Sequence, residues 1–489
     1  MSPIRLNKSN PFFLILVVLV YVLLTIVSLN NCYFWDNIQQ ISKEAHWFYL
    51  TDFNSIIMPS QGSGSEIVAT GYHPPLMGIM TAALWKIFGY RLWVSHIFVL
   101  CWSIILIYNV WKLIRLFFAE KFAGWVVLIV MLEPTVLTQF SIASPDFILF
   151  TAFVISLRAL LEHKPRLLSI GLFFLCCINM RGIFAGGILF FIYGYFEYGN
   201  KNKDIRSISL VKFLLPYLPT LLLLIAYFTY YFITRGWFFS DSYGSDHYSL
   251  PTGLLRVIRH LAEFGLRTIE NGRFFIWLLG FYITYQTLKS KSILTHQTKT
   301  ILLFFILLTG LYFLFVFISQ MPFSARYFMP QFFMLTILVL SGVTRFLQKN
   351  KTVLIFLLVL CFELTGHFWI YPEKIAKSWD CTLAHLPYYE LRKECFNYID
   401  QQKLNYNDIS AGFCFYGNRQ YIELSHAGKR VGTEPNRKYF IYSNISNVED
   451  SLVVALKNQP NWIPIKRFEK GFVFIEIYKN SLFKNKTEP

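Results

Sequence analysis

Long apolar runs recur along most of this chain, and they constrain its fold more than any other feature. Each run has about 18 residues or more, which is enough to cross a bilayer core of roughly 30 Å. With 55% hydrophobic and 15% charged residues among 489, the composition is not that of a soluble protein. The sequence therefore predicts a mainly α, polytopic membrane protein. About eleven transmembrane helices are expected, at 11–29, 92–116, 122–142, 145–161, 167–180, 182–198, 210–233, 273–288, 300–319, 327–344 and 352–371.

The first apolar run follows the basic segment MSPIRLNKSN and at first sight resembles a secretory signal peptide. The run at 11–29 is longer than a typical signal core, and no small-residue cleavage site follows it. We therefore expect an uncleaved transmembrane helix whose N-terminal end lies in the cytoplasm.

Basic residues support this orientation. The connections expected on the cytoplasmic side are 112–121, 158–166, 199–212, 289–299 and 345–351. Each of them carries several lysines or arginines, as the positive-inside rule requires. The net charge of +17 is dispersed over these short clusters, so nucleic acid is not an expected partner. The short basic loops favour a bacterial inner membrane, with the segment 30–91 and the tail on its periplasmic side.

Two segments of the first outer loop, 30–91, are expected to lie along the membrane surface. The segment 74–89, PPLMGIMTAALWKIFG, is apolar enough to be mistaken for a spanning helix. If it crossed the membrane, every later basic loop would move to the outer face. We therefore interpret it as an interfacial helix, and 36–50 as a second one.

The tail, 372–489, is more polar than the rest of the chain. Its sequence predicts a small extracytoplasmic α/β domain that follows a transmembrane catalytic domain at 1–371. Alternating stretches such as KGFVFIEIYK at 470–479 are typical of strands. The tail cysteines Cys381, Cys395 and Cys414 leave a disulfide open, because spacing alone assigns no pairing. No Cys/His spacing typical of a metal site occurs, so no metal ion or other cofactor is indicated.

Under this topology, several polar residues gather at the outer membrane face. They are Asp36 in YFWDN, His73 in YHPPL, Asp146 in SPDF, Arg181 in MRG, and Arg326 with Tyr327 in SARYFMP. Each also has a structural interpretation. Ser144-Pro145-Asp146 is typical of a helix start, an acid can solvate a helix end, a histidine can be structural, and arginines can bind lipid headgroups. Glu133 and Glu363 lie within apolar runs, and we assign neither to the site.

The outer loop at 234–272 leaves two interpretations open. It contains Asp246 and His247, followed by a basic amphipathic stretch with Arg256, Arg259 and Arg267. A helix on anionic lipid is favoured for this stretch. The alternative is a lid, or a phosphate-attracting wall, over a site.

The order of these motifs resembles that of the GT-C glycosyltransferases, in particular the protein O-mannosyltransferase and aminoarabinose-transferase type of families 39 and 83. The shared order is WD after the first helix, HPPL, FG followed by Arg91, SPD, RG, and RY with a proline three residues later. The likeness covers most of 11–345. The two prolines after His73 restrict the backbone there, which would aim the imidazole at a phosphate.

The resemblance implies inverting transfer of a sugar from a polyprenyl-phosphate donor to an acceptor hydroxyl on the outer face. It implies Asp36 as the base, and Asp146 as the group that orients the acceptor or the base. The donor phosphate would be held by His73, Arg181 and Arg326, and the pocket would be lined by Tyr72, Tyr327, Asp246 and His247. Asn37 replaces a frequent second acid, which weakens a metal role. His73 replaces a lysine of some members and is charged only partly at pH 7.

This chemistry needs no nucleotide, and the chain has no Gly-rich phosphate loop. Cations meet the negative charge that develops on the leaving phosphate, and a carboxylate activates the acceptor hydroxyl. Membrane lipids and a lipid, glycan or protein acceptor are the expected partners. Two alternatives stay open: a flippase for a lipid-linked sugar, although no matching halves are visible, and a non-catalytic scaffold that acts through its tail.

Overall fold

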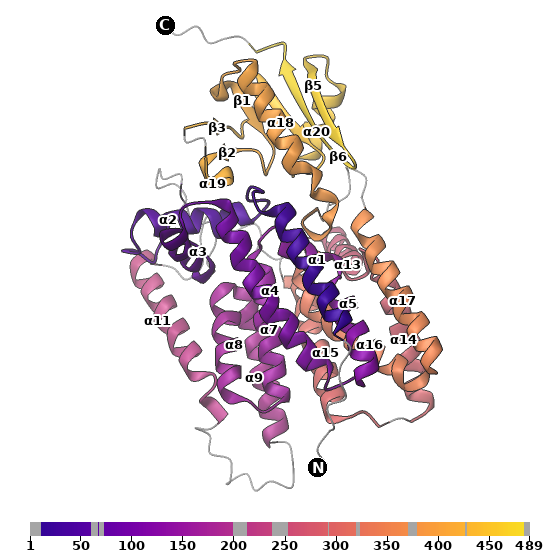
Figure 1. Cartoon of the computed structure of the whole chain (residues 1–489). Coiled ribbons are helices and arrows are strands. Elements are labelled where there is room, and N and C mark those ends of the chain that lie inside the picture. Colours follow the sequence, from indigo (N-terminus) through magenta and orange to yellow (C-terminus); the bar gives the residue numbers. More distant parts are fainter. Residues whose placement is uncertain are drawn as a thin grey trace.

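The chain forms a long helical bundle that carries a small α/β unit at one end (Figure 1). The computed structural model describes residues 11–59, 67, 73–198, 213–236, 253–291, 293–318, 323–369, 379–425 and 428–483. The turn that carries Asp36 and the helix start that carries Asp146 both lie at the end of the bundle that faces the α/β unit. The fold therefore fixes the site at this end.

The bundle consists of helices that follow the apolar runs closely. They are α1 (Phe12–Ser28), α4 (Leu92–Ile114), α5 (Glu120–Met131), α6 (Pro134–Ser141), α7 (Pro145–Leu161), α8 (Pro165–Ile178), α9 (Met180–Tyr198), α11 (Leu218–Arg235), α14 (Phe274–Lys289), α15 (His296–Ile318), α16 (Met329–Phe346) and α17 (Lys349–Thr365). Within the described residues, five helical spans are long and apolar enough to cross a membrane, or six if one bent pair counts as a span. This is the architecture of a multi-pass membrane protein, whereas eleven spans stay a prediction.

The prediction of a single helix at 122–142 is wrong, because this segment forms two helices, α5 and α6, with a bend of 57° between them. Pro134 cannot donate a backbone hydrogen bond and therefore starts a new helix. Glu133 caps that helix, since its carboxylate accepts from the backbone N–H of Val136 at 2.9 Å. The break lets α6 end at the face of the bundle where α7 begins.

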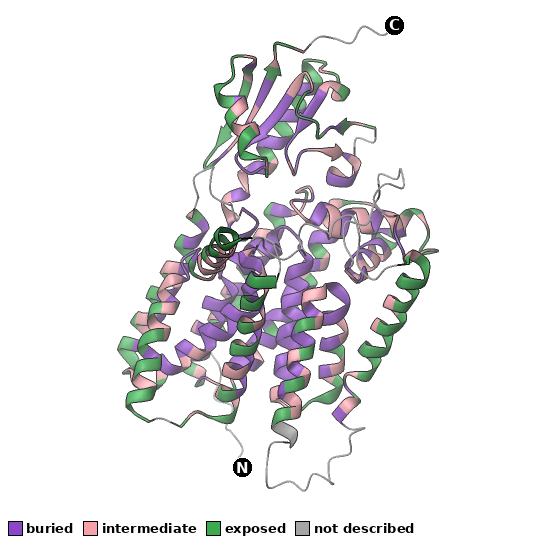
Figure 2. Ribbon diagram, turned by 180° about the vertical axis from the view of Figure 1, so that it is seen from behind, coloured by how far each residue is buried: buried purple, intermediate pink, exposed green. Residues whose placement is uncertain are grey.

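Exposed side chains on the outer faces of the bundle are mostly apolar, while its centre is buried (Figure 2). Ile233, Leu288 and Phe191 each expose at least 71% of their surface. An apolar exterior of this extent is typical of a lipid-facing surface. At the centre lies α7, in which every residue from Pro145 to Leu160 is buried. The acid at its first turn is thus carried by the best-packed helix of the bundle.

The described basic connections, at 112–121, 158–166, 289–291, 293–299 and 345–351, lie at the end of the bundle away from the α/β unit, as consecutive antiparallel helices require (Figure 1). Arg345 donates to the carbonyl of Ile293 at 3.2 Å, so two of these connections touch. Arg158 donates to Asn109 at 2.8 Å and joins the ends of α7 and α4. The charge asymmetry read from the sequence is therefore an asymmetry between the two ends of the fold.

The two segments expected at the membrane surface form short helices side by side, next to the α/β unit (Figure 1). They are η1 (Ile38–Lys43) with α2 (Glu44–Leu50), and α3 (Leu76–Phe88). Gly78 of α3 lies directly against Glu44 of α2, so the two helices approach closely. The 13 residues of α3 reach only about 20 Å, short of a bilayer core of roughly 30 Å.

The tail forms a mixed sheet with helices, as the alternating pattern at 470–479 predicts. Its elements are η5 (Trp379–Cys381), α18 (Pro387–Gln401), β1 (Ile409–Ala411), β2 (Gly417–Asn418), α19 (Gln420–Glu423), β3 (Arg430–Val431), β4 (Tyr439–Ser443), α20 (Asp450–Asn458), β5 (Trp462–Lys470) and β6 (Val473–Asn480). The strand order is β1-β4-β6-β5, and only β1 and β4 of this sheet pair in parallel. Cys381, Cys395 and Cys414 are buried free thiols, so the described residues contain no disulfide.

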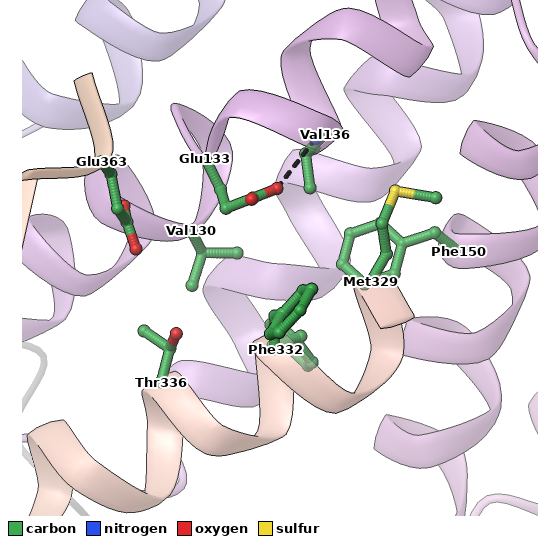
Figure 3. Close-up of a pocket in the computed structure, with 9 residues that line it drawn as sticks. Val130, Glu133, Val136, Phe150, Met329, Phe332, Thr336 and Glu363 are labelled. Atoms are coloured by element: carbon green, nitrogen blue, oxygen red, sulfur yellow. Dashed lines mark hydrogen bonds between the residues drawn. The ribbon is translucent and has the colours of Figure 1, made fainter. Parts of the chain in front are cut away.

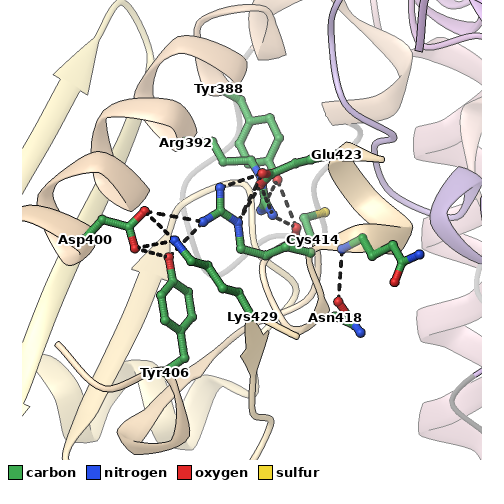
Figure 4. Close-up of polar contacts among 10 residues, drawn as sticks. Tyr388, Arg392, Asp400, Tyr406, Cys414, Asn418, Glu423 and Lys429 are labelled. Atoms are coloured by element: carbon green, nitrogen blue, oxygen red, sulfur yellow. Dashed lines mark hydrogen bonds and ion pairs between the residues drawn. The ribbon is translucent and has the colours of Figure 1, made fainter. Parts of the chain in front are cut away.

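A buried ionic network holds the α/β unit together below its sheet (Figure 4). Arg392 of α18 pairs with Glu423 of α19 at 3.0 Å, and Arg419 pairs with the same carboxylate at 2.6 Å. Arg392 also donates to the carbonyl of Cys414 at 2.8 Å, and Tyr388 does so at 3.0 Å. The network therefore fixes the loop after β1, which faces the helical bundle.

Two exposed serines test which side of the membrane each end of the fold faces. Ser290 lies in a basic connection and Ser481 follows β6. We expect a membrane-impermeant maleimide added to intact cells to label the Ser481→Cys variant, and to label Ser290→Cys only after permeabilisation, because basic loops stay in the cytoplasm. The unsubstituted chain gives the background from its own cysteines. Labelling of Ser290→Cys in intact cells would contradict the orientation.

Candidate active site

The structure brings together six of the residues that the motifs singled out, from segments far apart in the sequence. Asp36 lies in the turn after α1, His73 is separated from the start of α3 by Pro74 and Pro75, and Asp146 lies in the first turn of α7. Arg181 was expected between two helices, but it lies in the first turn of α9. Arg326 and Tyr327 lie in η3 (Ala325–Phe328) before α16. All of these positions are at the end of the bundle next to the α/β unit.

Three other expected pocket residues, Tyr72, Asp246 and His247, lie outside the described residues. The same holds for most of the loop before α13 (Leu254–Ile269). Their part in the site stays a prediction.

Arg326 is the centre of the cluster, because its guanidinium pairs with carboxylates from three segments. It pairs with Asp36, with Asp146 at 3.3 Å between Nε and Oδ2, and with Asp380 at 2.9 Å between Nη1 and Oδ2. Only 5% of the Arg326 side chain is exposed. A buried charge needs charged partners, and these three carboxylates provide them.

Arg181 forms the second cationic position. Its Nη2 donates to Asp146 Oδ1 at 2.5 Å, and Asn179 Oδ1 accepts from its backbone N–H and from its Nε. The guanidinium carbon lies 4.0 Å from the centre of the Tyr327 ring, and that of Arg326 lies 5.3 Å from it. Tyr327 is thus in contact with both cations through its ring.

His73 is uncharged in this environment, whereas the sequence alone suggested partial charge at pH 7. Burial, and then the positive charge of Arg181, lower the pKa of His73 to about 4, although Asp146 and Asp36 act in the opposite direction. Its Nδ1 accepts from the backbone N–H of Met180 at 3.4 Å. The other ring nitrogen therefore carries the proton and is a hydrogen-bond donor.

The exposed fractions separate the members of the cluster. The Asp36 side chain is 34% exposed and that of Arg181 is 15% exposed. Asp146 and Asp380 expose only 3% each. Burial raises the pKa of Asp380 more than the neighbouring Arg326 lowers it. Asp36 is therefore the carboxylate of this cluster that a ligand reaches most easily, and Arg181 is the more accessible guanidinium.

The two acid-bearing turns have strained backbones and are bonded to each other. Trp35, just before Asp36, has a φ of 56°, and Ala143, at the turn into α7, has a φ of 54°. Residues with side chains rarely adopt this left-handed conformation, and it often occurs at functional sites. Asn37 Nδ2 donates to the carbonyl of Ile142 at 2.8 Å. Asn37, which the sequence analysis identified as the replacement of a second acid, thus joins the turn that carries Asp36 to the turn that carries Asp146.

Asp380 is the member of the cluster that the sequence analysis missed. It lies in η5, beyond the last helix of the bundle, and no motif marks it. Gln139 of α6 donates to its backbone carbonyl at 2.7 Å, which fixes η5 against the bundle. Within the described residues, no group of three or more His, Cys, Asp or Glu side chains has a geometry that suits a metal ion. Around these carboxylates, the guanidinium of Arg326 occupies the central position.

The acids within apolar runs belong to a separate buried cluster (Figure 3). Glu133 pairs with Arg273, whose guanidinium lies 3.7 Å from the ring centre of Phe332. Glu133, Phe332 and Glu363 all line one small cavity. The Oε2 atom of Glu363 has no hydrogen-bond partner within the described residues. Because Glu133 caps α6 and is already paired, this cluster supports the break between α5 and α6.

The amphipathic helix α13 is anchored to the segment that leads to Arg326. Arg267 donates from Nε to the carbonyl of Phe323 at 3.0 Å, and it pairs with Glu270 at 2.9 Å. Leu254 and Leu255 are exposed at the other end of the helix. The exposed leucines agree with a helix on the membrane surface. The hydrogen bond from Arg267 to Phe323 links α13 to the segment that leads into η3.

Replacing Arg326 by methionine should destabilise the protein, because Asp146 and Asp380 would then be buried without their shared cation. Breaking a buried ion pair in this way costs about 3 kcal/mol of unfolding free energy. Arg345→Met in α16, the helix that follows η3, is the matched control, since Arg345 is exposed and the expected loss is within about 0.5 kcal/mol. Thermal unfolding in detergent measures both. Equal unfolding temperatures for the two variants would contradict a central role of Arg326.

The comparisons with known proteins identify the fold. No protein-family model and no curated protein matches the sequence. Two solved structures of ArnT, an aminoarabinose transferase, from Cupriavidus metallidurans match over 96% of this chain and 98% of theirs, at 12% identity. The TM-score is 0.56 for the apo state and 0.53 for the state bound to undecaprenyl phosphate. A third match, the arabinofuranosyltransferase AftD from Mycobacteria, has a TM-score of 0.46, 13% identity, and covers 98% of this chain and 40% of that one. The chain therefore has the fold of ArnT over nearly its whole length.

Proposed function

We propose that this protein is a membrane glycosyltransferase that moves a sugar from a polyprenyl-phosphate donor to an acceptor hydroxyl. The observation that supports it most is a cluster, on the fold of ArnT, that holds both an accessible carboxylate and an accessible guanidinium. The carboxylate is Asp36, which pairs with Arg326, and the guanidinium is Arg181, which pairs with Asp146. ArnT, which shares this fold, has been solved with undecaprenyl phosphate. The bacterial inner membrane, with the α/β unit in the periplasm, is the proposed location.

In the proposed reaction Asp36 acts as the base. It takes the proton of the acceptor hydroxyl while the hydroxyl oxygen attacks the anomeric carbon of the donor sugar. The bond from that carbon to the phosphate oxygen breaks, and the electron pair leaves with the polyprenyl phosphate. A single displacement of this kind inverts the configuration at the anomeric carbon. The two cations of the cluster differ in how far they can assist the leaving group.

Arg181 is the proposed cation that meets the charge on the leaving phosphate, because it is more exposed than Arg326. His73 contributes as a neutral donor, through the ring nitrogen that does not accept from Met180. Arg326 was expected to bind the same phosphate. Since its guanidinium already pairs with carboxylates from three segments, we assign it a positioning role. Asp146 then orients both Arg181 and Arg326, and Tyr327 lines the pocket between them.

A flippase without chemistry is less well supported by the arrangement of charges. The cluster around Arg326 lies at one end of the bundle, whereas alternating access uses a site near the membrane midplane. In this proposal the acceptor is a lipid, a glycan or a protein, and the sugar is left unassigned.

The Asp36→Asn variant tests the base. We expect sugar transfer from a labelled polyprenyl-phosphate donor to fall by at least about 100-fold, because the amide cannot accept the proton. The matched control is Asp52→Asn in the same outer loop, whose carboxylate is 73% exposed and pairs with Lys86; its rate should stay within about two-fold. Transfer in isolated membranes is the measurement. Near-normal turnover of Asp36→Asn would remove Asp36 from the mechanism.

The charge state of His73 gives a prediction about pH. With a pKa of about 4, His73 stays neutral above pH 5, so it adds no titration to donor binding. We expect the KM for the donor to be flat between about pH 5.5 and 7.5, where an unperturbed histidine would titrate. His73→Gln should raise KM and keep the profile flat. An inflection near pH 6.5, about the usual histidine pKa, that disappears in this variant would show that His73 acts as a cation.

A further inference from the structure

A cavity of about 480 Å³ lies in the α/β unit, at the carboxyl ends of the parallel strands β1 and β4. Gly412, Phe413 and Tyr416 line it from the chain that follows β1, and Ser451 and Leu452 line it from the first turn of α20. Its volume is within the range of small-molecule sites, about 300 to 1,000 Å³. The carboxyl ends of parallel strands are also where open α/β sheets bind ligands.

One wall of this cavity touches the turn that carries the proposed base. The ring of Phe413 packs edge to face on Trp35, with 5.3 Å between the ring centres, and Trp35 directly precedes Asp36. The next residue, Cys414, has a φ of 83°, and its carbonyl accepts from Tyr388 and Arg392 (Figure 4). The ionic network therefore holds this wall rigidly against the active-site turn.

The side chains that line the cavity suit an uncharged, ring-shaped polar ligand. Phe413 and Tyr416 offer aromatic surface, while Asn447 and Ser451 offer an amide and a hydroxyl. Among the described residues that line it, Glu449 is the one ionisable acid, and there is no lysine or arginine. A phosphate or carboxylate placed here would meet a carboxylate and no cation. A saccharide instead presents C–H faces to the aromatic rings and hydroxyls to the polar groups.

We propose that this cavity binds an uncharged saccharide that is part of the acceptor. The proposal rests on the proposed function, since the hydroxyl that Asp36 deprotonates would belong to the bound acceptor. It names the substrate class: a neutral glycan, rather than a peptide or a phosphorylated headgroup. The α/β unit then selects the acceptor, while the bundle end holds the donor.

The test measures binding separately from transfer. The full-length protein in nanodiscs is applied to an array of neutral oligosaccharides and of sulfated and phosphorylated ones, without any donor. We expect neutral oligosaccharides to bind. Ser451→Leu, which fills the cavity, and Tyr416→Ala, which removes an aromatic wall, should each weaken binding at least about ten-fold. Val454→Leu on the same helix is the matched control, because Val454 is exposed and does not line the cavity.

The outcomes separate this inference from the proposed function. If no neutral oligosaccharide binds, if the charged ones bind better, or if Ser451→Leu binds as the unsubstituted chain does, the inference is overturned even where sugar transfer is normal. Asp36→Asn should bind the same oligosaccharides while it loses transfer. If binding depends on Ser451 and Tyr416 but no sugar transfer occurs with any donor, the saccharide site stands and the proposed function falls. Equal unfolding temperatures of the variants show that each one folds.

Discussion

The pairing of one buried guanidinium with carboxylates from three separate segments is the interaction on which the site depends. Asp36, Asp146 and Asp380 would repel one another if they were brought together without Arg326. With the cation among them, the turn after α1, the start of α7 and η5 can meet at one point. The cation also leaves Asp36 partly exposed. The supporting charges are thus inside, and the reactive one is at the surface of the cluster.

Much of the fold follows from the sequence, because apolar length and basic loops are local properties. The positions of the helices follow from the apolar runs, and the alternation at 470–479 corresponds to the strand β6. The break between α5 and α6 was missed, although Pro134 was visible inside the expected helix 122–142. An apolar run that continues across a proline hides a bend, since hydropathy carries no information about backbone hydrogen bonds. The ion pair of Glu133 with Arg273 could be seen only once the fold placed the two residues side by side.

The site was predictable where a motif carries the residue, and it was not where only a long-range contact does. The order of the motifs led to Asp36, Asp146, Arg181 and Arg326, and the structure places all four together. Asp380 has no such motif, and its contact with Arg326 spans the junction between the bundle and the α/β unit. The neutral state of His73 depends on how deeply the fold buries it, which its neighbours in the sequence do not specify.

The position of Asp380 after the last bundle helix has a consequence for biogenesis. Chains are made from the N-terminus, and their parts fold as they emerge. The ribosome adds this carboxylate only after every helix up to α17 has been made. Until then Arg326 lacks one of its anions, and the cluster stays incomplete in nascent, partly inserted protein. Completion of the charged centre therefore requires synthesis through Asp380, and chains that end before this residue would lack one of its three carboxylates.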